Sequence, residues 1–182
     1  MKNQIFLLSI GSGGMNILND IKSFKVENCQ FLYINNIDYE AREDGFDPIF
    51  DKININEKII LEQDDLEEKL SSLLFDIKQI NIVITLGSKT ATISPKILNF
   101  IIEKLSSKVN VFAIYPFGFE KEERIIRANE TLKNIKQLTK DIFLFQNDKL
   151  LEKGHNVKMQ ELFKSLSEEI YNHIKMESNY DL

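Results

Sequence analysis

Residues 5–14, IFLLSIGSGG, place a short apolar run directly before a glycine-rich turn. A nearly continuous apolar run of this length is typical of a strand that is buried on both faces of a parallel sheet. Residues 15–24 follow with apolar side chains at helical spacing, among them Met15, Leu18 and Ile21. The stretch therefore predicts the strand, turn and helix that open a βαβ unit.

The same alternation of buried strands and amphipathic helices continues outward along the chain. Residues 38–64 interrupt it, because they are polar and weakly periodic, and they predict a loop with one or two short strands. Ser94 is predicted to cap a helix that has Pro95 at its first position. The predicted strands cover residues 31–34, 80–86, 109–114 and 142–145, and the predicted helices cover residues 66–77, 95–105, 121–138 and 157–175.

Strands that alternate with helices indicate an α/β fold, with a doubly wound, mainly parallel sheet that is flanked by helices and is Rossmann-like. We expect one domain over residues 1–176, which ends at the long last helix, and a disordered tail over residues 177–182.

Composition limits the class of protein. A chain of 182 residues with 43% apolar residues is sufficient for one buried core. Lys and Arg total 23 against 28 acidic residues, so the formal net charge is -5 and nucleic acid is not an expected partner. Cys29 is the only cysteine, which excludes an internal disulfide and a thiolate metal cluster. With two histidines and no bilayer-spanning stretch, we expect a cytoplasmic protein without a metal site or direct membrane insertion.

The glycine-rich turn is the first candidate binding site. Gly11, Ser12, Gly13 and Gly14 stand between a strand and a helix, where backbone N–H groups can approach a phosphate at the positive end of the helix. A tight turn that happens to be rich in glycine explains the same residues equally well. Asn16 stands where the third glycine of G-x-G-x-x-G would fall, so a dinucleotide-binding fold is the poorer match.

Two later motifs carry a more specific signal. Residues 115–120, YPFGFE, follow a predicted strand and precede the helix that holds Arg124, and residues 145–151, FQNDKLL, close the next strand. Here the chain resembles the FtsZ/tubulin superfamily, whose corresponding runs read close to P-F-x-F-E and N-D-K-L-L. The resemblance continues in order along nearly the whole chain, at residues 34–36 (I-N-T-D in the family), 85–87 (T-A-G) and 161–164 (D-A-F-K).

The resemblance implies a nucleotide site that takes GTP or GDP. It gives Glu120 and Arg124 the role of sugar contacts, Asn147 the role of the guanine-binding amide, and Phe163 the role of the ring packed against the base. These residue types suit those roles, because a carboxylate accepts from ribose hydroxyls and an amide can pair with a purine edge. Purely local roles also remain open: Glu120 can favour a helix N-terminus, and Asn147 can cap a turn.

The chain departs from the family pattern on the phosphate side. The signature loop G-G-G-T-G-T-G corresponds here to a shorter segment that keeps Gly87, Thr90 and Thr92 but one glycine only, so the phosphate nest is predicted to be remodelled. Lys89 is either a solvated loop residue or a point charge for a phosphate. The position of the guanine-binding Asp of the family is Ser167, which weakens guanine specificity. We also expect the acidic loop and the second domain that follow in FtsZ to be missing.

These features favour an FtsZ-like protein that does not polymerise or hydrolyse GTP, and that acts through contacts with FtsZ or another cell division protein. The alternative is a nucleotide-binding module of the same GTPase family. An autonomous hydrolase has little support, because no Ser-His or paired-carboxylate arrangement is visible and we predict no catalytic residue. A self-associating scaffold, and so a homo-oligomer, remains a further alternative.

Overall fold

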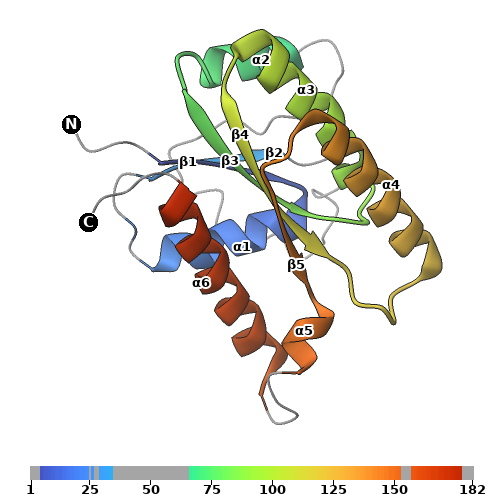
Figure 1. Ribbon diagram of the computed structural model, residues 1–182. Helices are drawn as coiled ribbons and strands as arrows, with labels where there is room; N and C mark the ends of the chain where they lie inside the picture. The colour runs from blue at the N-terminus through green and yellow to red at the C-terminus, as the bar shows by residue number, and fades with distance from the viewer. Residues whose placement is uncertain (1–4, 25, 27–28, 35–65, 153–156, 178–182) are drawn as a thin grey trace, which may run out of the picture.

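The computed structural model describes residues 5–24, 26, 29–34, 66–152 and 157–177. In these residues, strands and helices alternate along the chain (Figure 1). The strands are β1 (Ile5–Ile10), β2 (Cys29–Ile34), β3 (Gln79–Thr85), β4 (Lys108–Tyr115) and β5 (Ile142–Gln146). The helices are α1 (Ser12–Ser23), α2 (Leu66–Leu73), α3 (Ser94–Leu105), α4 (Glu122–Leu138), α5 (Asp148–Leu151) and α6 (Met159–Glu177), with a 3-10 turn, η3 (Thr90–Ile93), before α3.

The five strands form one parallel sheet in the order β2-β1-β3-β4-β5. Because all the strands run in the same direction, the loops that follow them meet at one edge of the sheet. The order reverses between β1 and β3, since β2 lies on one side of β1 and the later strands lie on the other. In open α/β sheets, ligands bind outside the carboxyl ends of the strands at such a point.

Helices cover both faces of the sheet and bury a core on each. Leu8 and Ile10 of β1 face the core under α2, α3 and α4, whereas Leu7 faces the core under α1 and α6 (Figure 1). Three buried polar side chains, Ser9, Asn81 and Asn110, interrupt the apolar strands. Asn110 Nδ2 donates to Asn81 Oδ1 at 3.0 Å, and Asn81 Nδ2 donates to the carbonyl of Phe6. Burial on both faces explains the continuous apolar runs that identified these strands.

The structure confirms the doubly wound parallel α/β fold and corrects three local predictions. Helix α1 begins at Ser12 rather than at Met15, because Gly13 and Gly14 are helical. Helix α2 ends at Leu73 rather than at residue 77, because the chain turns through a left-handed Asp76 with φ 62°. Ser94 is not a cap: it lies inside the helix, and its hydroxyl donates to the carbonyl of Ala91 at 2.7 Å.

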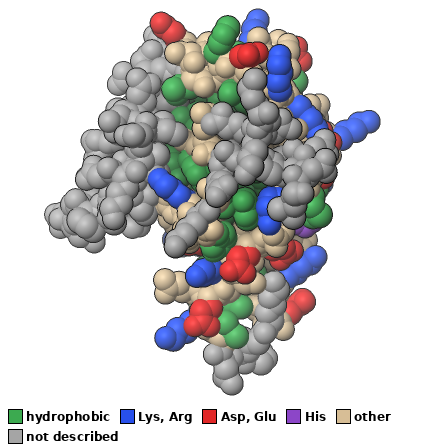
Figure 2. Space-filling view, turned by 90° about the vertical axis from the view of Figure 1, so that its left-hand side faces the viewer, with side chains coloured by type: hydrophobic (Ala, Val, Ile, Leu, Met, Phe, Trp, Pro, Cys, Tyr) green, Lys and Arg blue, Asp and Glu red, His purple; other side chains and the backbone are tan. Residues whose placement is uncertain are grey.

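Other predictions fall where the structure can say less. The short strands expected within residues 38–64 lie outside the described residues. Of the disordered tail expected over residues 177–182, Glu177 is instead the last residue of α6, and residues 178–182 lie outside the described residues. No helix of the described part is long and apolar enough to cross a membrane. Acidic and basic side chains are interspersed on the face shown in Figure 2.

Candidate functional site

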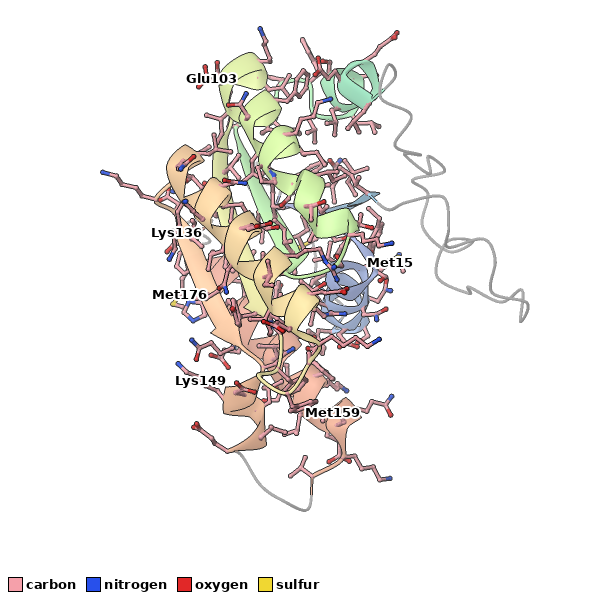
Figure 3. The ribbon with its side chains drawn as sticks, turned by 90° about the vertical axis from the view of Figure 1, so that its right-hand side faces the viewer. Met15, Glu103, Lys136, Lys149, Met159 and Met176 are labelled. Carbon is pink, nitrogen blue, oxygen red and sulfur yellow. The ribbon has the colours of Figure 1, made fainter. Side chains whose placement is uncertain are left out.

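The predicted site residues gather at the edge of the sheet where the parallel strands end. Gly11 to Gly14 follow β1, Gly87 to Thr92 follow β3, Glu120 follows β4, and Asn147 follows β5. Helix α6 begins at the same end of the molecule: in Figure 3 its first residue, Met159, and Lys149 of α5 both lie toward the bottom of the view. The topology therefore brings together residues that are far apart in the sequence.

Close packing of α1 on β3 accounts for two of the glycines after β1. A Cβ on Gly13 would lie 2.2 Å from Thr85 Oγ1, and a Cβ on Gly14 would lie 2.6 Å from the carbonyl oxygen of Val83. Both positions therefore exclude a side chain whether or not a phosphate binds. Gly11 is the N-cap of α1 and has no side chain, so no capping side chain accepts from the N–H groups of the first turn. The side chain of Asn16 is exposed on α1.

The loop after β3 is a closed turn. The backbone N–H of Ala91 donates to Ser88 Oγ at 3.0 Å, and that of Thr92 donates to the carbonyl of Lys89 at 3.2 Å. The hydroxyl of Thr92 donates to the same carbonyl at 2.6 Å. The side chain of Thr90 lies against Gly11, with its Cβ 3.6 Å from where a Gly11 Cβ would stand. Two backbone N–H groups and one hydroxyl of the predicted phosphate loop are thus bonded within the turn.

Gly87 packs closely against α4. It has φ 88°, and a Cβ there would lie 2.6 Å from both Cγ and the carbonyl oxygen of Arg124. The guanidinium of Arg127 donates from Nε to the carbonyl of Gly87 at 2.9 Å. Only glycine combines this backbone conformation with so close an approach. The role of Gly87 in this structure is to seat the β3 loop on α4.

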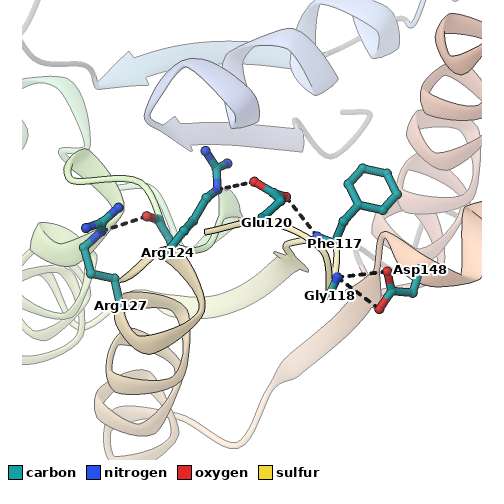
Figure 4. A network of polar contacts seen from close by, with 7 residues as sticks. Phe117, Gly118, Glu120, Arg124, Arg127 and Asp148 are labelled. Carbon is teal, nitrogen blue, oxygen red and sulfur yellow. Dashed lines mark hydrogen bonds and ion pairs between the residues drawn. The ribbon is translucent and has the colours of Figure 1, made fainter. Parts of the chain in front are cut away.

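A polar network holds the loop between β4 and α4 (Figure 4). Glu120 Oε1 accepts from the backbone N–H of Phe117 at 2.9 Å, and Glu120 Oε2 pairs with Arg124 Nε at 2.7 Å. Asp148 at the start of α5 accepts from the backbone N–H of Gly118 at 3.0 Å. The two predicted sugar contacts therefore contact each other, and Asp148 connects their loop to the next one. The ion pair adds about 1 kcal/mol at most, because both side chains are partly exposed.

The base side of the predicted site contains an amide oxygen without a partner. Asn147 is 9% exposed, and its Oδ1 has no hydrogen-bond partner in the described part of the chain. Its side chain makes no capping bond to α5, although its carbonyl accepts from the backbone N–H of Leu150. The alternative role of Asn147 as a turn cap is therefore not supported. Phe163 is partly buried, and its ring meets the ring of Phe117 edge-on at 6.3 Å.

Ser167 is fully buried on α6 and contacts a carboxylate from α1. Its Oγ lies 2.8 Å from Asp20 Oδ2 and 3.0 Å from the carbonyl oxygen of Phe163. Asp20 belongs to no motif, and its partner is 147 residues away, so the sequence did not predict this contact. Asp148, for which the sequence left a turn-capping role open together with Asn147, instead accepts from the backbone N–H of Gly118 on another loop.

Comparison with known proteins identifies the fold. No known family model matches the chain. The cell division protein FtsZ of Mycoplasmopsis pulmonis (strain UAB CTIP) is 24% identical over 169 residues, which covers 87% of this chain and 43% of that protein. FtsZ of M. jannaschii, solved as an empty dimer, is 18% identical with a TM-score of 0.71, and the match covers 100% of this chain and 57% of the other. The chain has an FtsZ/tubulin-like fold. CetZ1 of Haloferax volcanii, solved as a GDP-bound monomer, has a TM-score of 0.71 at 14% identity and covers 93% of this chain and 58% of the other.

The FtsZ/tubulin-like fold confirms the resemblance predicted from the two motifs. This chain spans less than two thirds of the length of each of these proteins. Within the FtsZ/tubulin-like fold, Glu120 lies on the loop before α4, Arg124 lies in the first turn of α4, and Asn147 precedes Asp148, which accepts from the Glu120 loop at Gly118. The Phe163 ring contacts Phe117 of the same loop. The loop at Thr90 and Thr92, in contrast, is closed on itself. The residues predicted for the sugar and base thus lie on neighbouring segments, whereas the predicted phosphate loop is bonded within itself.

Proposed function

We propose that the chain is a guanine-nucleotide-binding domain of the FtsZ/tubulin type, which holds its ligand by the base and sugar and does not hydrolyse it. The single observation that carries this proposal is the buried Oδ1 of Asn147, which has no hydrogen-bond partner in the described part of the chain. A buried amide oxygen without a partner costs about 1–3 kcal/mol, so it favours a ligand that supplies a donor. The choice of GDP or GTP follows from the GDP-bound CetZ1, whose fold the chain resembles.

The sugar side leaves room for ribose hydroxyls. An ionised carboxylate offers about four lone-pair sites. The hydrogen bond from Phe117 N uses one site on Oε1, and Oε2 lies in an ion pair with Arg124 Nε, so both oxygens of Glu120 keep acceptor sites. Because these contacts already orient the carboxylate, a ribose that binds here meets an acceptor fixed in place. Preorganisation of this kind lowers the entropy cost of binding.

The closed turn after β3 supports binding without hydrolysis. Phosphoryl transfer depends on donors and cations that are aimed at the transferred group. In this turn the N–H groups of Ala91 and Thr92 and the hydroxyl of Thr92 are bonded locally. Opening the turn would require these bonds to be exchanged for bonds to phosphate. The groups that could still contact the phosphates are the N–H groups in the first turn of α1 and the guanidinium of Arg124.

Isothermal titration calorimetry with GDP, GTP and ATP tests the proposal. We expect GDP and GTP to bind with similar affinity and ATP to bind more weakly, with no phosphate release from GTP. Asn147→Ala should weaken GDP binding about tenfold, the equivalent of one hydrogen bond. Asn134→Ala, at an exposed position of α4, is the matched control and should bind as the wild type does. The proposal would be contradicted if none of the three nucleotides gave a binding signal at millimolar concentration, or if phosphate were released from GTP above the protein-free rate.

We further propose that this nucleotide-side end of the molecule acts in cell division, in the cytoplasm, by contacting FtsZ without forming filaments of its own. The observation that favours this role is a set of exposed apolar side chains on the loops around the site. Phe119 is 73% exposed and stacks on Phe117 at 4.9 Å, on the loop that Glu120 and Asp148 fix. The other exposed apolar side chains at this end are Leu151, Val157 and Met159.

Sedimentation of FtsZ filaments with and without this protein tests the contact. We expect the wild type to change the mass of pelleted FtsZ or to pellet with it, and Phe119→Ser to reduce that effect. Phe75→Ser is the matched control, because Phe75 is 81% exposed but follows α2, at the end of the sheet where the strands begin. Equal behaviour of the two variants would argue against this surface. Oligomers of the isolated protein in light scattering would support the alternative of self-association.

A further inference from the structure

Asp20 and Ser167 form a contact between α1 and α6 that no motif predicted. Ser167 Oγ lies 2.8 Å from Asp20 Oδ2, and Ser167 is fully buried whereas Asp20 is partly exposed. The two helices lie on the same face of the sheet (Figure 1). The contact therefore holds a carboxylate from α1 beside the third turn of α6.

This carboxylate keeps an open acceptor. In the part of the chain that the structure describes, Ser167 is the hydrogen-bond partner of the Asp20 side chain, through Oδ2 only, and no Lys or Arg forms an ion pair with Asp20. Ser167 has a single proton, which it can give either to Asp20 or to the carbonyl of Phe163. Asp20 Oδ1 is thus available to a donor from outside the fold.

An aromatic ring stands on the same side of α6 as this acceptor. Phe163 precedes Ser167 by four residues, a spacing that places two side chains on one face of a helix. The Phe163 ring contacts Phe117 at 6.3 Å, and Phe117 belongs to the loop that Glu120 orients. A flat ring and an open carboxylate on one helix face suit a planar ligand whose edge carries N–H donors.

We infer that Asp20 is the residue that selects guanine over adenine at the proposed nucleotide site, and that Ser167 positions it. This inference rests on the proposed function. The Watson–Crick edge of guanine presents the N1–H and the 2-amino group, both donors, whereas adenine presents a bare N1 acceptor there. An ionised carboxylate only accepts, so it binds the first edge and repels the second. The carboxylate comes from α1, not from position 167 of α6.

Ser167 acts through Asp20 and is a positioning residue. When its hydroxyl donates to Oδ2, Oδ1 remains free to accept from the ligand. Replacing it with alanine should loosen the carboxylate and reduce selectivity without removing the charge. The exchange variant, with Asp20→Ser and Ser167→Asp together, returns a carboxylate to the same contact from the other helix. It should therefore retain the preference for guanine that Asp20→Asn loses.

Calorimetry with GDP, IDP and ADP tests the inference on the full chain. We expect the wild type to prefer GDP over ADP by at least about tenfold. Asp20→Asn should weaken GDP binding about 10- to 100-fold, as expected for loss of a charged hydrogen bond. It should weaken IDP less, because hypoxanthine lacks the 2-amino group, and it should not weaken ADP. Asp141→Asn, the same charge change at an exposed position before β5, should leave all three affinities unchanged.

The outcomes separate this inference from the proposed function. If the wild type binds none of the three nucleotides, the proposed function fails and the inference fails with it. If the wild type binds GDP but Asp20→Asn keeps the wild-type ratio of GDP to ADP affinity, the inference fails and the proposed function stands. Thermal melts of each variant confirm folding. If Asp20→Asn melts early, the exchange variant decides: loss of guanine preference in a folded exchange variant overturns the inference.

Discussion

Replacing Gly14 with alanine tests whether packing requires the glycines that follow β1. A Cβ on Gly14 would lie 2.6 Å from the carbonyl oxygen of Val83 and 3.2 Å from Ser9 Cβ, so it meets the backbone of β3. A carbonyl in the middle of a parallel sheet cannot rotate away as a side chain can. The methyl group therefore forces α1 away from β3.

Two opposing terms set the size of the effect. Overpacking against the rigid backbone of β3 costs about 3 kcal/mol, the upper end of the usual range of roughly 1–3 kcal/mol. Alanine also favours the helical backbone over glycine by about 1 kcal/mol. The net loss in the free energy of unfolding is about 2 kcal/mol, which lowers the Tm of a domain of this size by about 4–8 °C.

Thermal melts followed by circular dichroism at 222 nm, supported by urea titration, measure this loss. Gly118→Ala is the matched control, because its Cβ would lie 3.1 Å from Asp148 Oδ2, the end of an exposed side chain that can move. We expect the control to change stability by about 0.5 kcal/mol or less. A Gly14→Ala variant as stable as the wild type, or more stable, would refute the packing argument. Binding of a phosphate would then be the remaining explanation for glycine at this position.

Three further predictions concern polar groups. Glu120→Gln removes the ion pair with Arg124, and because both side chains are partly exposed we expect urea titration to show a loss of about 1 kcal/mol or less. Asn110→Ala removes the buried donor to Asn81 Oδ1 and should cost about 2–3 kcal/mol in the same assay. Burial raises the pKa of the Cys29 thiol from 9.0 to about 11, so the unfolded chain ionises first and stability should fall as the pH rises from about 9 to 11. Cys29→Ala should make that fall smaller in melts at these pH values.

The fold was predictable because its signals are local. Each central strand is a largely apolar run, as expected for a sheet covered on both faces, and each run ends at a turn. The start of α1 was predicted wrongly because glycine disfavours helices on average, whereas here the missing side chain lets the first turn press on Val83 and Thr85. The early end of α2 depends on the left-handed Asp76, a conformation that no spacing pattern reports.

The candidate site was predictable only where its residues share a motif. Glu120 and Asn147 were identified because contiguous runs contain them, and the structure places their loops side by side through Asp148. Asp20 was missed because a contact between α1 and α6 leaves no trace in the spacing of either helix. Because Ser167 stands where the family has an acid, the sequence alone suggested weaker guanine specificity. The contact with Asp20 offers a carboxylate at the same place from a different helix.

The closed turn after β3 limits what a bound nucleotide can signal. A protein changes state with GTP hydrolysis only if one of its conformations binds the triphosphate more tightly than the diphosphate. The groups that would read a third phosphate, the N–H groups of Ala91 and Thr92, are bonded to Ser88 and Lys89. If base and sugar contacts supply the affinity, GDP and GTP shift the conformational equilibrium equally. The proposed site would then report that a guanine nucleotide is present, and its contacts with a partner would not depend on the phosphate state.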